Sequence, residues 1–459
     1  MQKRFLLLTL AFASLGNAQG NPEVVAKVIE LGKSGNQTRS HLEYLCEQIG
    51  HRLTGSSNLQ RACDWTAAKF KEFGCQNVRL EQWGEIPVGF DRGTHHVGRM
   101  VSPNPRNFEF TTRSWTAGTG GPRSGGVFLE PTTVEDVAKA APRGKWMLML
   151  PRQGDGLPPR ETREAVLAAA RAEGIHGTVA ASRNELVITS GSWNNLDFEN
   201  LPKDVDVTVR KSDFDAVTAA MQAGGMPVLE FDLDQKFVKG PIPVYNVIAE
   251  IPGVSKPDEI VIVSGHLDSW DGPGSQGTCD NGTGTMVALE AARLLMAAGA
   301  KPERTIRFIL WTGEEQGLWG SRKYVEMHPD ELANISAVIV DDGGTNYCGG
   351  LVGTEAMKPM LEQAIAPLAE AFPDLPMTIR GQAQMPQGGG SDHASFNRAG
   401  VPGFFWMETG VADYNYIHHT QHDKLVGAIH RYLVQSSVAS AVTAYNLACA
   451  PTMLPRQGG

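Results

Sequence analysis

Apolar residues recur at two different spacings along the chain, and the spacing predicts which segments are helices and which are strands. Residues 21–83 follow mainly the helical period, with a strand expected at Val78–Gln82. After Pro241, four strongly apolar runs predict buried strands at Ile260–Ser264, Thr305–Thr312, Ala337–Val340 and Gly403–Met407. Helical segments separate these runs, notably Gly284–Ala298 and Met357–Ala371. The alternation predicts an α/β fold with a mostly parallel or mixed central sheet flanked by helices.

Residues 120–240 differ from the segments on either side, because their strand candidates are short and closely spaced. The strands are expected at Val127–Leu129, Trp146–Leu150, Gly177–Ala181, Asp206–Val209 and Val228–Phe231. Helices are expected between them at Val134–Ala140, Glu161–Glu173 and Ser212–Ala223. We therefore expect a smaller α/β domain at 120–240 between the segments 19–119 and 241–459. A chain of 459 residues is long enough for more than one domain, since single cores rarely grow beyond about 250–300 residues.

The first 18 residues have the pattern of a signal peptide. Lys3 and Arg4 precede an apolar run from Phe5 to Leu15, and small residues lead to a cleavage point after Ala18. The alternative, a buried helix, is disfavoured because the run has no helical stripe. No later stretch is long and apolar enough to span a bilayer. We expect an exported protein, periplasmic or secreted, without a membrane span.

Charge and cysteine content narrow the range of partners and ligands. The chain has 41 Lys and Arg against 50 Asp and Glu, a formal net charge of −9 without a block of five like charges. Nucleic acid is therefore a poor partner, because its binding rests on clustered cations. The six cysteines show no C-x-x-C spacing, which argues against a cysteine-rich zinc site. Small buried residues with one or two disulfides are the favoured interpretation.

Histidines and carboxylates cluster where the predicted strands and their connections end. Five segments carry them: Gly265-His266-Leu267-Asp268, Cys279-Asp280-Asn281-Gly282, Gly313-Glu314-Glu315-Gln316-Gly317, Asp341-Asp342-Gly343-Gly344 and His418-His419-Thr420-Gln421-His422-Asp423. Each segment alone would be read as an ordinary turn or helix cap. Parallel strands, however, bring their carboxyl ends to one edge of a sheet, where ligands bind. We therefore expect these side chains to meet.

Carboxylates and imidazoles together suit a pair of zinc ions. Three carboxylates and a bridging hydroxide would balance the four charges of two Zn²⁺ ions, and two such metals share bridging ligands in hydrolases. His266 and Asp280 are candidate ligands, and of Glu314 and Glu315 one would bind metal while the other acts as a base. Asp341 competes with Asp342 for one position, and His418, His419 and His422 compete for another.

The segments Gly265–Asp271 and Trp311–Gly317 resemble the two-zinc exopeptidases of the bacterial leucyl aminopeptidase type. Within that group they are most similar to the branch of carboxypeptidase Q, also called plasma glutamate carboxypeptidase. Ala399–Gly403 and the His418-His419 pair followed by Asp423 agree with this branch. The resemblance covers most of the mature chain. It implies that residues 120–240 are a protease-associated (PA) domain inserted into the catalytic domain, and that the protein can be a homodimer.

The resemblance also implies a role for individual residues. Asp280 would bridge two zinc ions, with His266 and Asp342 completing one metal site and Glu315 and His419 the other. Glu314 would be the general base. Asp268 would orient His266. The remaining candidates are substrate or oxyanion residues: His418, where many relatives carry a tyrosine, and Ser391 and Asp392, whose loop lines the substrate pocket in relatives but is equally compatible with an ordinary turn.

The implied activity is hydrolysis of dipeptides or short peptides with a free N-terminus by a dinuclear zinc exopeptidase. A metal-bridging hydroxide would attack the scissile carbonyl while Glu314 moves the proton. Two alternatives remain: a catalytically inactive, receptor-like binding protein of the same fold, and a one-zinc acyl transferase of the glutaminyl cyclase type. The metal content and the need for a free substrate amine distinguish them.

Overall fold

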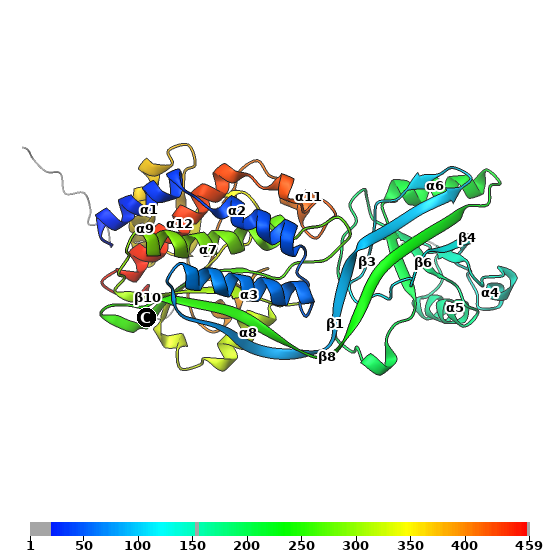
Figure 1. The fold of residues 1–459 in the computed structure, drawn as a ribbon, viewed down its shortest axis with the longest axis horizontal. Helices are drawn as coiled ribbons and strands as arrows, with labels where there is room; N and C mark the ends of the chain where they lie inside the picture. The colour runs from blue at the N-terminus through cyan, green and yellow to red at the C-terminus, as the bar shows by residue number, and fades with distance from the viewer. Residues whose placement is uncertain (1–19, 152–155, 457–459) are drawn as a thin grey trace, which may run out of the picture.

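The computed structural model describes residues 20–151 and 156–456, so the expected signal peptide lies outside the described residues. The chain forms two lobes joined by two long strands, β1 (Gln76–Ser102) and β8 (Val228–Ile251), which run through both lobes (Figure 1). Among the described residues, no helix combines the length and the apolar character that crossing a bilayer requires.

The larger lobe has a mixed sheet at its centre. Strands β15 (Gly403–Phe405), β11 (Ile335–Val340), β9 (Lys256–His266) and β10 (Arg304–Trp311) lie side by side in that order and are parallel. Strand β8 pairs antiparallel with β10, and β1 pairs antiparallel with β8. The four strands expected after Pro241 are all present, and the predicted fold class is confirmed.

Alternate side chains of this sheet pack on opposite helical layers, as the period of a strand requires. Ile262 and Ile309 point to one layer, formed by α8 (Trp319–Met327) and α10 (His393–Arg398). Phe308 and Ile339 point to the other. That second layer contains α1 (Pro22–Ser34), α2 (Thr38–Glu43), α3 (Ser57–Glu72), α7 (Thr283–Ala297), α9 (Lys358–Ala371) and α12 (His430–Ala448).

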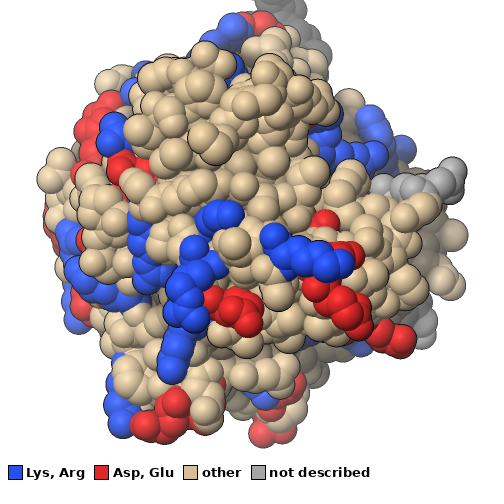
Figure 2. All heavy atoms as spheres, turned by 90° about the vertical axis from the view of Figure 1, so that its right-hand side faces the viewer, with Lys and Arg blue, Asp and Glu red and all other residues tan. Residues whose placement is uncertain are grey.

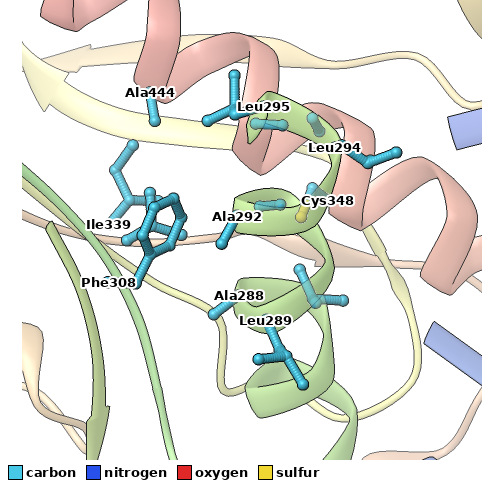
Figure 3. Close-up of a cluster of buried hydrophobic side chains, with 14 of the residues drawn as sticks. Ala288, Leu289, Ala292, Leu294, Leu295, Phe308, Ile339, Cys348 and Ala444 are labelled. Atoms are coloured by element: carbon cyan, nitrogen blue, oxygen red, sulfur yellow. The ribbon is translucent and has the colours of Figure 1, made fainter. Parts of the chain in front are cut away.

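Helix α7 lies at the centre of this layer and carries the N-terminal connection on which Asp280 sits. Ala288, Ala292 and Leu295 belong to the same buried cluster as Phe308 and Ile339 of the sheet (Figure 3). Its outer side is covered by α12, so that α7 is apolar on nearly all sides. The tight packing fixes the start of α7 relative to the strand ends.

The strands of the second lobe continue the sheet of the larger lobe through β8, which pairs antiparallel with the first of them. Strands β4 (Arg123–Leu129), β5 (Trp146–Leu148), β6 (Gly177–Ala181) and β7 (Val205–Val209) are parallel, and β3 (Phe110–Thr112) pairs antiparallel with β7. The associated helices are α4 (Glu135–Lys139), α5 (Arg160–Ala172) and α6 (Lys211–Gln222). Basic and acidic side chains are intermixed over the end face of this lobe (Figure 2). Every strand and helix predicted between Val127 and Phe231 has a counterpart in the structure.

Two expectations about local structure need correction. The strands predicted at Val78–Gln82 and Val228–Phe231 are only parts of β1 and β8, which have 27 and 24 residues. Register shifts interrupt their pairing, for example between Ile86 and Val88, so their alternation is broken in the sequence. The expected one or two disulfides are also wrong, because all six cysteines are free thiols.

Candidate metal centre

Five connections bring the predicted ligands to the same edge of the larger lobe's sheet. His266 is the last residue of β9, and Glu315 and Asp342 follow β10 and β11. Asp280 precedes α7, and His419 follows the short helix α11 (Tyr414–Ile417). Helix α11 lies on the side of the larger lobe that faces the second lobe (Figure 1). The parallel strands thus deliver their ligands as their topology predicts.

The five side chains form two histidine–carboxylate pairs with Asp280 between them. His266 Nε2 lies 2.9 Å from Asp342 Oδ1 and 3.4 Å from Asp280 Oδ1. His419 Nε2 lies 3.0 Å from Glu315 Oε2 and 3.4 Å from Asp280 Oδ2. Asp280 therefore turns one carboxylate oxygen toward each histidine, which is the arrangement of a bridging ligand.

The donor set fits two zinc ions. Two ligands at about 2.0–2.1 Å from a tetrahedral zinc are about 3.3 Å apart, and the pairs above span 2.9–3.4 Å. Asp280 Oδ2 is buried without a hydrogen-bond partner among the described residues. His266 Nδ1 lies 3.0 Å from the backbone carbonyl of Asp268, which leaves Nε2 free for a metal.

The geometry distinguishes between the candidates that compete for the same position. Asp342 faces His266, whereas Asp341 points away to a separate group that also contains Cys348 and Glu408. His419 reaches both Glu315 and Asp280. His422 instead stacks on Tyr416, with ring centroids 4.3 Å apart. These positions favour Asp342 and His419 as the ligands.

His418 lies beside the ligands without occupying the same position as His419. Its ring stacks on that of His419 with centroids 3.7 Å apart, and Tyr414 lies 5.0 Å away on α11. His418, His419 and Asp280 offer ligand atoms within 4.8 Å of one another. His418 is therefore placed to contact a group bound at the centre. Tyr414, which no sequence motif indicated, has a pKa that is raised by burial and by the carboxylates of Asp280 and Asp342.

The carboxylates of the site lie close together, and the pKa values of Glu314 and Glu315 are raised. Burial raises the pKa of Glu315 well above its usual range, and the charge of Asp280 acts in the same direction. Burial lowers the pKa of His266, but the carboxylates of Asp342 and Glu314 outweigh it, and that pKa lies well above 6.5. Such crowding of buried anions indicates a site that binds cations.

Glu314 and Asp268 lie next to the ligands. The Asp268 carboxylate accepts hydrogen bonds from the backbone N–H groups of Glu314 at 3.3 Å and Glu315 at 3.2 Å. It also accepts one from Thr54 Oγ1 at 3.1 Å, while its distance to His266 Nδ1 is 3.7 Å. Asp268 thus anchors the connection that carries both glutamates. Burial raises the pKa of Glu314 well above its usual range. The charge of His266 lowers this pKa, whereas that of Asp342 raises it further.

Ser391 and Asp392 are fully buried just before α10. Ser391 Oγ and both Asp392 carboxylate oxygens lack a hydrogen-bond partner among the described residues. Burial raises the pKa of Asp392 to about 7, with His266 opposing and Asp342 adding to the shift. The charge of Asp392 also raises the pKa of Glu314. Ser391 and Asp392 are therefore buried polar residues and not part of an exposed turn.

Arg52 supports the centre and was not predicted from the sequence. Its buried guanidinium donates to the backbone carbonyls of Leu267 at 2.6 Å and Gly277 at 2.7 Å. It also donates to the carbonyls of Gly50 at 3.1 Å and Gln276 at 3.2 Å. Arg52 therefore ties the end of β9 to the segment before Asp280. The only signal in the sequence is a lone arginine in an otherwise uncharged stretch.

The sequence and the fold are similar to those of known peptidases. The model of Peptidase family M28 matches residues 246–437, which contain all five candidate ligands. Carboxypeptidase Q of Mus musculus is 26% identical over 457 residues, covering 97% of this chain and 93% of that protein. Residues 246–437 therefore carry the sequence pattern of peptidase family M28.

Solved structures show how much of the M28 architecture is shared. The crystal structure of a peptidase M28 precursor from Shewanella amazonensis is 25% identical, with a TM-score of 0.67. The match covers 95% of this chain and 99% of that one. A zinc aminopeptidase from Bacillus subtilis has the same fold, with 22% identity, a TM-score of 0.57, and coverage of 89% and 94%. Both lobes of the chain therefore fall within the similarity.

Proposed function

We propose that this protein is a zinc-dependent exopeptidase of the M28 type that holds two zinc ions per chain. It would hydrolyse dipeptides or short peptides with a free N-terminus. The observation that carries the proposal is the position of Asp280, which turns one oxygen toward the His266–Asp342 pair and the other toward the His419–Glu315 pair.

The five ligands would hold the metals in two neighbouring positions. Bound zinc lowers the pKa of a water molecule and polarises a carbonyl group, which is the chemistry that peptide hydrolysis needs. The three carboxylates of Asp280, Glu315 and Asp342 supply the negative charge that two such ions require. A chain with a complete ligand set is poorly explained as an inactive receptor, and the bridging position of Asp280 favours two metals over one.

Glu314 would move the proton. It follows β10 directly, is not one of the paired ligands, and its backbone is held by the Asp268 carboxylate. Its raised pKa suits a group that accepts a proton from the attacking water and passes it to the leaving amine. His418 would donate to the developing oxyanion, and Ser391 and Asp392 would line the substrate pocket beside Glu314.

The wider organisation follows the resemblance on which the proposal builds. Residues 120–240 would be a PA-like domain inserted between the catalytic segments 19–119 and 241–459. The second lobe supports such an insertion (Figure 1), although β3 (Phe110–Thr112) also belongs to this lobe and lies before residue 120. Export to the periplasm or the medium, directed by residues 1–18, and a homodimer both stay predictions.

The decisive experiment compares Glu314→Gln with the wild-type protein. We expect the variant to keep two zinc ions per chain and to lose about 10²–10⁴-fold in kcat/KM on unblocked dipeptides. Glu362→Gln, an exposed glutamate on α9, is the matched control and should leave both properties unchanged.

Full activity of Glu314→Gln with zinc bound would refute the assignment of the base. One zinc per chain together with cyclisation of N-terminal glutamine would identify an acyl transferase. Absence of both zinc and turnover in the wild-type protein would support a binding protein. Blocking the substrate amine should abolish cleavage, and equal cleavage of N-blocked dipeptides would argue against an aminopeptidase-type reaction.

A further inference from the structure

A segment of the second lobe lies directly against the loop that carries His419. Ile188 and Thr420 form an isolated antiparallel bridge. The N–H of Thr189 donates to the backbone carbonyl of His419 at 2.9 Å. His419 itself adopts φ +60°, a left-handed conformation that is uncommon for a residue with a side chain. The second lobe thus makes a backbone hydrogen bond to a candidate metal ligand.

Gln421 extends this contact with its side chain. Its Oε1 accepts from the N–H of Val187 at 3.0 Å. Its Nε2 donates to Glu109 Oε2 at 2.9 Å and to the Glu185 carbonyl at 3.2 Å. All three partners belong to the second lobe, and Gln421 is 7% exposed. A buried glutamine with three partners from the other lobe is a specific link between the two lobes.

The second lobe also supports the segment that holds Glu315. The Trp270 N–H donates to Glu315 Oε1 at 3.2 Å. The neighbouring Asp271 accepts from Ser114 Oγ at 2.5 Å and forms a buried ion pair with Arg92, whose Nε lies 3.2 Å from its Oδ2. Both partners of Asp271 come from the part of the chain that leads into and through the second lobe.

The two metal positions therefore differ in how they are built. Two of the ligands, His266 and Asp342, follow adjacent strands of the larger lobe directly, and both are less than 10% exposed. In the other pair, His419 lies on a loop that the second lobe contacts, and Glu315 accepts a hydrogen bond from Trp270, the neighbour of Asp271. Any loosening of the contact between lobes should act first on the Glu315–His419 position.

We propose that the second lobe clamps one of the two metal positions, and that Gln421 is the positioning residue of this clamp. The proposal rests on the proposed metal centre and deepens it. Gln421 is fixed by its three hydrogen bonds to the second lobe, and Thr189 fixes the backbone of His419. His419 is thereby held beside Glu315 and Asp280. The second lobe would thus control zinc occupancy at the His419 position in addition to any contact with substrate.

The first test is Gln421→Ala in the full-length mature protein, with the exposed Gln82→Ala as matched control. Zinc remaining on the protein is measured against a series of chelator concentrations. We expect the variant to lose one zinc at an about tenfold lower chelator concentration than the wild type, the order of one hydrogen bond's net contribution. The other zinc should be lost at an unchanged chelator concentration. Equal weakening of both positions, or none, would overturn the proposal.

The second test exchanges the roles of two side chains. Gln421→Glu alone places two carboxylates together and should weaken the same metal position. Combining it with Glu109→Gln restores a donor–acceptor pair and should recover part of the lost zinc affinity. A double variant no better than the single one would contradict a direct contact between these two residues.

A third readout needs no metal. In metal-free protein, hydrogen exchange of the segments 185–191 and 414–423 should be faster in Gln421→Ala than in the wild type. Unprotected exchange of both segments in the wild type would overturn the clamp. If the wild type bound no zinc, the proposed function would fail, whereas the exchange experiment would still decide whether the lobes are linked through Gln421.

Discussion

Replacing Arg52 by methionine tests how much its hydrogen bonds to backbone carbonyls stabilise the candidate metal centre. The guanidinium of Arg52 is fully buried and donates to four backbone carbonyls in three segments of the chain. Methionine keeps much of the side-chain volume and removes every donor. Leu267 and Gly277 would lose the two shortest of these bonds, and both are completely buried contacts.

The structure sets the expected magnitude. A buried carbonyl left without a donor costs about 1–3 kcal/mol. The bonds to Gly50 and Gln276 are partly buried, so water can replace the donor there. Two unsatisfied carbonyls therefore cost about 2–6 kcal/mol, and the relief of burying a cation offsets part of it. We expect a net loss of about 3–4 kcal/mol, a large fraction of the 5–15 kcal/mol that stabilises a typical domain.

The assay is thermal unfolding of metal-free protein, because bound metal would add stability by mass action. Arg52→Met should lower the melting temperature of the larger lobe by on the order of 10 °C. Arg61→Met, at an exposed position on α3, is the control and should change stability by less than about 0.5 kcal/mol. A melting temperature of Arg52→Met within about 2 °C of the wild type would refute this account of Arg52.

Two further predictions concern pH and packing. Burial lowers the pKa of His41 to about 4, so the folded protein keeps this imidazole neutral while the unfolded chain binds a proton below about 6.5. As the pH falls from 6.5 to 4, the free energy of unfolding of the wild type should therefore decrease by about 2–3 kcal/mol more than that of His41→Phe, measured by urea unfolding. An equal pH dependence of the unfolding free energy in the two proteins would contradict this prediction. A Cβ at Gly265 would lie 2.9 Å from the backbone of Gly284, so Gly265→Ala should cost about 1–3 kcal/mol and reduce zinc binding. Gly388→Ala, where a Cβ meets nothing within 4 Å, is the control, and equal stability of the two variants would show that the loop adapts.

The meeting of the candidate ligands at the strand ends could be predicted because a short-range pattern and a topological rule act together. Apolar runs locate β9, β10 and β11, and parallel strands must end at the same edge. His266, Glu315 and Asp342 then meet whatever the lengths of the helices between them. The choice of Asp342 over Asp341 needed the resemblance, and the structure supports it because only Asp342 faces His266.

Other features could not be predicted from the sequence, because they depend on contacts between residues that are far apart in the chain and follow no periodic pattern. Arg52 contacts carbonyls 215 and 225 residues away, and any buried backbone oxygen can accept from an arginine. Strand β1 escaped detection beyond Gln82, since its register shifts break the alternation that identifies a strand. The free thiols were mispredicted because an oxidising compartment permits disulfides without supplying the geometry that they require.

The two halves of the candidate metal centre also differ in whether adjacent strands or contacts between distant loops position their residues. The His266–Asp342 pair follows from adjacent strands of one sheet, so it should tolerate changes in the second lobe. The Glu315–His419 pair depends on loop contacts between lobes, which no sequence period encodes and which involve Gln421 and Thr189. If the clamp operates, substitutions far from the larger lobe's sheet will change metal binding at one position only. Loss of the second lobe's contacts with residues 419–421 would then loosen the His419 position and leave the His266–Asp342 pair in place.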